Sequence, residues 1–173
     1  MAKVALFAKA PMPGLVKTRL AEAIGEVDAL ACYAALLSNA VAVARGFDAE
    51  VWLEGATEDD DRWAGGLPLR AQPRGDLGTK MLAAFNAGID IVFGADVPGL
   101  TQGHVARAIG LLDENDLVLG PAEDVGYYLI GMRKPIPGLF GRMRWGTSEV
   151  LEETLRRAQT LRVGLTERLW DVD

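Results

Sequence analysis

Three cations stand close together near the N-terminus, Lys9, Lys17 and Arg19, and the segment between them contains Pro13 and Gly14. The apolar run that precedes them is short and ends in a turn, as is typical of a buried strand. In open α/β sheets, ligands bind at the carboxyl ends of the strands. A glycine-containing loop at such a position lets backbone N–H groups approach a polyphosphate, while lysine and arginine neutralise its charge.

The same segment is also compatible with an ordinary solvated turn, because Pro-Gly is common turn chemistry. It differs from the phosphate-binding pattern GxxxxGK[ST], since Val16 rather than glycine precedes Lys17-Thr18, and it is not GxGxxG. Spacing alone therefore leaves a phosphate loop and a solvated turn about equally supported.

Asp96 is the strongest candidate for a metal ligand. It follows a predicted buried strand, and Gly94, Pro98 and Gly99 indicate a tight bend around it. A carboxylate at a strand end can bind Mg²⁺ or Mn²⁺ together with substrate phosphates, because these ions take one or two protein oxygens and keep other positions open. The alternative role is to cap the next helix, but Thr101 is better placed for that.

Two further groups of carboxylates follow predicted strands. Glu123 and Asp124 precede two tyrosines, and Asp124 can act as a general base toward a hydroxyl acceptor, or the pair can be an ordinary turn. Asp171 and Asp173 lie on one side of an extended segment, because side chains alternate along a strand. This segment can complete a metal site if it crosses the sheet near Asp96, and otherwise it is an acidic terminus.

The composition excludes several classes of protein. The 173 residues suit a single domain over residues 1–173, and the net charge of −6 argues against general binding to nucleic acid or to an anionic membrane. One cysteine, Cys32, excludes an internal disulfide, and one histidine, His104, makes a Ser-His-Asp triad a poor explanation. We expect no membrane-spanning segment and no signal peptide, and therefore a cytoplasmic location.

Strand-like and helix-like segments alternate along the chain, which predicts an α/β layered fold with a largely parallel sheet. The predicted helix at 27–45 has an apolar stripe that includes Val27, Leu37 and Val41. The strand at 127–131 is expected to be antiparallel and at a margin of the sheet. The other predicted strands are 4–8, 51–53, 67–70, 89–93 and 117–119, with extended segments at 161–163 and 169–173. The other predicted helices are 76–88, 101–112 and 147–158, the last capped by Thr147.

Five blocks in this order resemble a known family. They are KAPMPGLVKTRL at 9–20, GDLG at 75–78, GADVPGL at 94–100, GPAEDVGYYLIG at 120–131 and WGT at 145–147. Over nearly the whole chain they are similar to bacterial glycosyltransferase-like proteins labelled arsenosugar-biosynthesis type, within the nucleotide-diphospho-sugar transferase (GT-A) superfamily. The resemblance implies a Rossmann-like three-layer sandwich with a mixed, mostly parallel central sheet, and a divalent metal, Mg²⁺ or Mn²⁺.

The resemblance also assigns roles to residues. The nucleotide diphosphate would be held by the loop and by the second block, and the residues implied are Lys9, Pro13, Gly14, Lys17, Thr18, Arg19 and Gly78. Asp96 would bind the metal, Asp173 would supply a second metal contact, and Asp171 is its neighbour. Glu123 and Asp124 match the block on the acceptor side.

Two departures from the family pattern are visible. Val125 stands where the family has glycine, and its branched side chain restricts the backbone and the approach of a ligand. The sequence stops at Asp-Val-Asp, where relatives continue into a further segment, which bears on how the metal site is closed.

Three functions are compatible with these residues. The first is transfer of a sugar from a nucleoside-diphosphate sugar to a small hydroxyl acceptor. The second is nucleotidyl transfer from a nucleoside triphosphate to a small phosphorylated acceptor, since the loop is also similar to that of phospholactate guanylyltransferases; Lys80, Arg133 and Arg142 are candidate cations for the acceptor phosphate. The third is a non-catalytic module that binds a nucleotide or a sugar.

Overall fold

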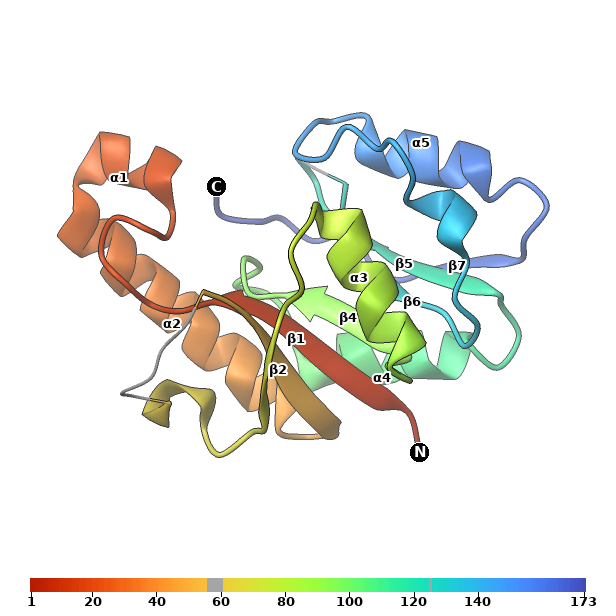
Figure 1. Ribbon diagram of the computed structural model, residues 1–173, viewed down its shortest axis with the longest axis horizontal. Coiled ribbons are helices and arrows are strands. Elements are labelled where there is room, and N and C mark those ends of the chain that lie inside the picture. Colours follow the sequence, from red (N-terminus) through yellow and green to blue (C-terminus); the bar gives the residue numbers. More distant parts are fainter. Residues whose placement is uncertain (56–60, 125) are drawn as a thin grey trace.

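One mixed sheet organises the computed structural model, which describes residues 1–55, 61–124 and 126–173 (Figure 1). Within these residues the strand order is β3-β2-β1-β4-β6-β5-β7. The strands are β1 (Lys3–Lys9), β2 (Asp48–Glu54), β3 (Leu69–Ala71), β4 (Ile91–Gly94), β5 (Leu117–Pro121), β6 (Tyr127–Gly131) and β7 (Val163–Leu165). All pairings are parallel except those of β6 with β4 and with β5. The carboxyl ends of β1, β2, β4 and β5 therefore lie along one edge.

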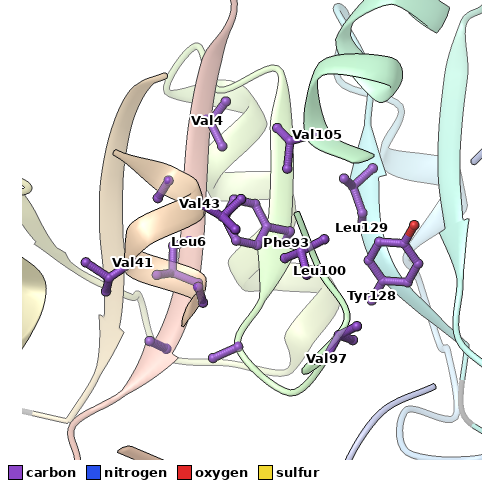
Figure 2. Close-up of a cluster of buried hydrophobic side chains, with 14 of the residues drawn as sticks. Val4, Leu6, Val41, Val43, Phe93, Val97, Leu100, Val105, Tyr128 and Leu129 are labelled. Atoms are coloured by element: carbon purple, nitrogen blue, oxygen red, sulfur yellow. The ribbon is translucent and has the colours of Figure 1, made fainter. Parts of the chain in front are cut away.

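Helices cover both faces of the sheet, which gives the three-layer, Rossmann-like sandwich that the family resemblance implies (Figure 1). They are α1 (Thr18–Ile24), α2 (Glu26–Ala44), α3 (Leu77–Asn86), α4 (Gln102–Leu111) and α5 (Val150–Arg157), with short 3-10 helices η1 (Arg62–Ala64) and η2 (Pro137–Leu139). Residues of α2 and α4 pack on one face, and residues of α3 and α5 pack on the other. Figure 2 shows the first of these cores, where Val43, Leu6 and Phe93 come from α2, β1 and β4.

The structure corrects several details of the sequence interpretation. The β6 strand is antiparallel as predicted, but it lies inside the sheet between β4 and β5, not at a margin. The α5 helix begins after Glu149, and the Thr147 hydroxyl donates to the Arg144 carbonyl instead of capping the helix. Cys32, the single cysteine, is a half-buried free thiol.

The predicted apolar stripe of α2 is partly wrong, because Val27 is 81% exposed while Leu37 and Val41 are buried. We also expected no apolar segment long enough to span a membrane, yet α2 passes that test by length and composition, with a mean hydropathy of 1.7 over its most apolar window. Eight of its residues are buried, and several of them pack against the sheet, so its apolar character is explained by the core.

Candidate functional site

A cavity of about 590 Å³ opens at the carboxyl ends of β1, β2 and β4. Its walls come from the loop between β1 and α1, from α3, from the turn after β4, from β6 and from the C-terminal segment. Of the residues that the sequence selects for the nucleotide, the metal or catalysis, those that line it are Lys9, Lys17, Thr18, Arg19, Asp96, Asp171 and Asp173. The fold therefore brings seven candidates from three distant parts of the chain to one cavity.

The backbone of Lys9, at the end of β1, is held by Tyr33 from α2. The Lys9 N–H donates to the Tyr33 hydroxyl over 2.8 Å, and that hydroxyl donates to the Lys9 carbonyl over 2.7 Å. Burial, opposed by the bond to Lys9, raises the pKa of Tyr33 to about 12, so the hydroxyl stays protonated at neutral pH. Tyr33 also lines the cavity, and the sequence interpretation missed it because tyrosine on an apolar helix face normally indicates core.

Lys17 is the most constrained cation of the loop. Its backbone has a left-handed conformation, with φ 49° and ψ 47°, immediately before α1. Its side chain is only 8% exposed, and its ammonium lies 2.6 Å from Asp96 Oδ1 and donates to the Val172 carbonyl. Lys17 thus joins the loop, the turn after β4 and the C-terminal segment.

The C-terminal segment crosses the carboxyl ends of the strands. Leu169 exchanges backbone hydrogen bonds with Pro121 and Glu123 beside β5, and the Val172 N–H donates to the Asp96 carbonyl over 2.9 Å. Arg19 forms an exposed ion pair of 2.8 Å with Asp173. Figure 1 shows the C-terminus beside α1, the helix that contains Arg19.

Asp171 carries a buried carboxylate oxygen, Oδ1, that has no hydrogen-bond partner among the residues that the structure describes. Burial raises the pKa of Asp171, a hydrogen bond from its own backbone N–H opposes this effect, and the negative charges of Asp124, Asp96 and Asp173 raise the pKa further. An unpaired buried carboxylate oxygen among other carboxylates is costly, and a cation is the natural means of compensation.

The donor set fits a hard divalent cation, although no three acidic, histidine or cysteine side chains of the described residues form a ready metal cluster. The available atoms are the Asp96 carboxylate, the unpaired oxygen of Asp171 and the Val172 carbonyl, and oxygen ligands of this type suit Mg²⁺ or Mn²⁺. Asp173 is paired with Arg19 and would have to exchange that partner to contribute.

Other selected residues lie outside the cavity wall. Pro13 and Gly14 are exposed in the loop, where Gly14 has a φ of 74° that favours glycine. Gly78 is buried inside α3 against Phe140 and Trp145. Glu123 and Asp124 are exposed in the turn between β5 and β6, and Val125 lies outside the described residues.

Sequence reasoning missed a polar group at the end of β2. Glu54 and Lys80 form an ion pair of 3.3 Å, the Gln72 side chain donates to the Trp52 carbonyl over 2.8 Å, and Glu54, Lys80 and Gln72 line the cavity. Lys80 was considered only as a cation for an acceptor phosphate. The position of Glu54 and Gln72 after parallel strands was the available signal.

Comparison with known proteins places the chain in a family. A family model described as uncharacterized proteins conserved in bacteria (DUF2064) matches residues 36–147, which is more than half of the chain. The chain belongs to the DUF2064 family. No curated protein sequence matches significantly.

Solved structures support the fold. A "putative nucleotide-diphospho-sugar transferase" from Desulfovibrio desulfuricans G20 is 32% identical over 100% of this chain and 83% of its own, with a TM-score of 0.86. The 4-diphosphocytidyl-2C-methyl-D-erythritol synthase of Anaerococcus prevotii DSM 20548 is 13% identical over 96% and 88% of the two chains, with a TM-score of 0.54. Rv0371c of Mycobacterium tuberculosis H37Rv, in complex with manganese, is 17% identical over 99% and 92%, with a TM-score of 0.53. At such identities the last two are similar in fold alone.

Proposed function

We propose that this DUF2064 protein is a metal-dependent glycosyltransferase that moves a sugar from a nucleoside-diphosphate sugar to a small hydroxyl acceptor. The observation that carries the proposal is the meeting of the cationic loop with Asp96, Asp171 and Asp173 in one cavity at the strand ends. The description of the 32% identical D. desulfuricans protein points to the same class of substrate.

In this proposal the residues of the loop bind the leaving diphosphate. Lys9, Lys17 and Arg19 neutralise charge that develops on its oxygens as the sugar–phosphate bond breaks. A bound Mg²⁺ or Mn²⁺, held by Asp96 and Asp171, would supply further stabilisation of that charge. Asp124 would accept the proton of the acceptor hydroxyl if the anomeric centre is inverted. Its negative charge contributes to the raised pKa of Asp171, which lines the cavity, and this supports the role.

Nucleotidyl transfer is the second candidate. Lys80 lines the cavity, where its ammonium can bind an additional phosphate of a nucleoside triphosphate or of an acceptor. The fold is also shared with the A. prevotii synthase. This reaction would release pyrophosphate instead of a nucleoside diphosphate. A non-catalytic binding module would release neither.

Two experiments test these alternatives. A thermal-shift panel of UDP, GDP, CDP, their sugars, GTP and CTP, with and without Mn²⁺, identifies the nucleotide, because a ligand at 100 times its Kd stabilises by about 2.7 kcal/mol. Product analysis with small hydroxyl acceptors then separates glycosyl transfer, which releases nucleoside diphosphate, from nucleotidyl transfer, which releases pyrophosphate. Absence of any shift would contradict every function in which the protein binds a nucleotide.

The first prediction concerns Asp96. Asp96→Asn should lower metal-dependent turnover by at least about 100-fold, because charge stabilisation by a bound metal is worth several kcal/mol. The matched control is Asp113→Asn. Asp113 follows α4 and forms an exposed ion pair with Arg133, and its substitution should leave turnover unchanged. An unchanged rate in Asp96→Asn would refute the metal assignment.

A further inference from the structure

The ammonium of Lys17 is bound by oxygens of the site, unlike that of a solvated loop lysine. Its side chain is 8% exposed, and its ammonium contacts the Asp96 carboxylate at 2.6 Å and the Val172 carbonyl. The left-handed backbone at Lys17 is a conformation that non-glycine residues rarely adopt. Such a conformation persists only where surrounding contacts determine it, and it is common at functional sites.

The oxygens that hold this ammonium are those that a divalent cation would use. Asp96 Oδ1 and the Val172 carbonyl are already engaged by Lys17, and the adjacent Asp171 keeps a buried oxygen that none of the described residues bonds. An ammonium and a divalent ion cannot share these ligands at close range, because like charges repel strongly in a partly buried site. Metal binding therefore requires Lys17 to leave.

We propose that the Lys17 ammonium occupies the divalent-cation position of the ligand-free protein, and that it moves onto the nucleotide phosphates when the metal binds. The inference rests on the proposed function, which supplies the phosphates as the new partner of Lys17. Without nucleotide, no phosphate is available to replace Asp96 as the partner of the ammonium. The ammonium therefore stays on Asp96 and opposes binding of the metal. The metal and the nucleotide then bind cooperatively, and each raises the affinity of the other by the same factor.

The test is Mn²⁺ binding without nucleotide, measured from the electron paramagnetic resonance signal of free Mn²⁺. Lys17→Met removes the ammonium and should bind Mn²⁺ at least about tenfold more tightly than the unmodified protein, because the carboxylates lose their internal counter-ion. Lys17→Gly also removes the charge and suits a φ of 49°, so it guards against misfolding of the methionine variant. Lys9→Met is the charge-matched control in the same cavity and should change the Mn²⁺ affinity less than twofold.

The outcomes separate this inference from the proposed function. If the unmodified protein binds Mn²⁺ and neither Lys17 variant binds it more tightly, competition by Lys17 is overturned while the metal-dependent function stands. If Lys9→Met tightens binding as much as Lys17→Met, the effect is general electrostatics and the inference also falls. If no variant binds Mn²⁺, with or without nucleotide, both the metal dependence and the inference are refuted.

Discussion

Tyr33 fixes the point where the cationic loop leaves β1, because its hydroxyl bonds both backbone groups of Lys9. The side chain is only 4% exposed, so water cannot replace these bonds without a local rearrangement. Tyr33→Phe should lower the free energy of unfolding by about 1–3 kcal/mol, the usual cost of leaving buried polar groups without partners. It should also weaken nucleotide binding, because Lys9 loses its fixed position. Urea unfolding and ligand titration measure the two effects.

Tyr128→Phe is the matched control for this prediction. Tyr128 also lines the cavity, but its hydroxyl bonds the Thr166 hydroxyl at 2.8 Å and the Glu167 carbonyl at 2.9 Å, not the cationic loop. The Tyr128→Phe variant should therefore have a lower free energy of unfolding and an unchanged nucleotide affinity. Equal affinities for Tyr33→Phe and the unmodified protein would show that the anchoring of Lys9 has no part in binding.

At the scale of the element, α3 contains a glycine, Gly78, whose lack of a side chain allows close packing. An ideal Cβ on Gly78 would lie 2.8 Å from Trp145 Cζ2, 3.0 Å from Phe140 Cβ and 3.1 Å from the Phe140 carbonyl oxygen. Gly78→Ala should therefore destabilise the protein by about 1–3 kcal/mol through overpacking. This outweighs the gain of up to about 1 kcal/mol that alanine brings to a helix. The midpoint of thermal unfolding is the readout.

Gly110 in α4 provides the opposite case, because no atom of the described part of the chain lies within 4 Å of its ideal Cβ. Gly110→Ala should raise the midpoint of unfolding by the helix-propensity gain alone. If both alanine variants are stabilised, the packing of Gly78 is looser than the structure indicates. A loss of nucleotide affinity in Gly78→Ala without a loss of stability would instead support the phosphate-binding role that the family resemblance assigns to Gly78.

The elements also show what the sequence can and cannot predict. Alternating strand and helix patterns predicted the mixed sheet correctly, because apolar periodicity and Gly/Pro punctuation are local signals. The interior position of β6 was not predictable in this way, since strand order depends on pairing between distant segments. The α1 helix was missed because it contains no buried residue and follows a loop rich in proline and glycine.

At the scale of the whole molecule, the site depends on the meeting of the loop after β1 with the C-terminal segment at the end of β4. The sequence marked Lys17, Asp96 and Asp171 separately, and their order along strands indicated a common edge of the sheet. The sequence alone leaves open whether the C-terminal segment crosses the sheet near Asp96. The hydrogen bond from the Val172 N–H to the Asp96 carbonyl shows that it does. The Lys17–Asp96 contact was not predictable, because it depends on a left-handed backbone that lysine rarely adopts.

The carboxylates gathered around Asp171 lower the stability of the whole protein. The folded state holds the Asp171 proton more tightly than the unfolded chain, so ionisation above the raised pKa destabilises the fold, and this cost is present at neutral pH. Asp171→Asn should therefore raise the midpoint of thermal unfolding at pH 7 by about 2 °C in metal-free buffer. A larger gain is not expected, because partial exposure screens the charges. The gain should vanish as the pH falls toward about 3.9, the ordinary pKa of aspartate.

The same substitution should have the opposite effect once ligands are present. Asp171→Asn removes a charged oxygen from the proposed metal site, so the stabilisation by Mn²⁺ and nucleotide together should be smaller than in the unmodified protein. Glu22→Gln, which neutralises an exposed carboxylate in α1, controls for the change in net charge and should alter neither quantity. Thermal unfolding with and without ligands measures both effects. A variant that is more stable when ligand-free and still gains the full ligand-induced shift would show that Asp171 has only a structural cost and no share in binding.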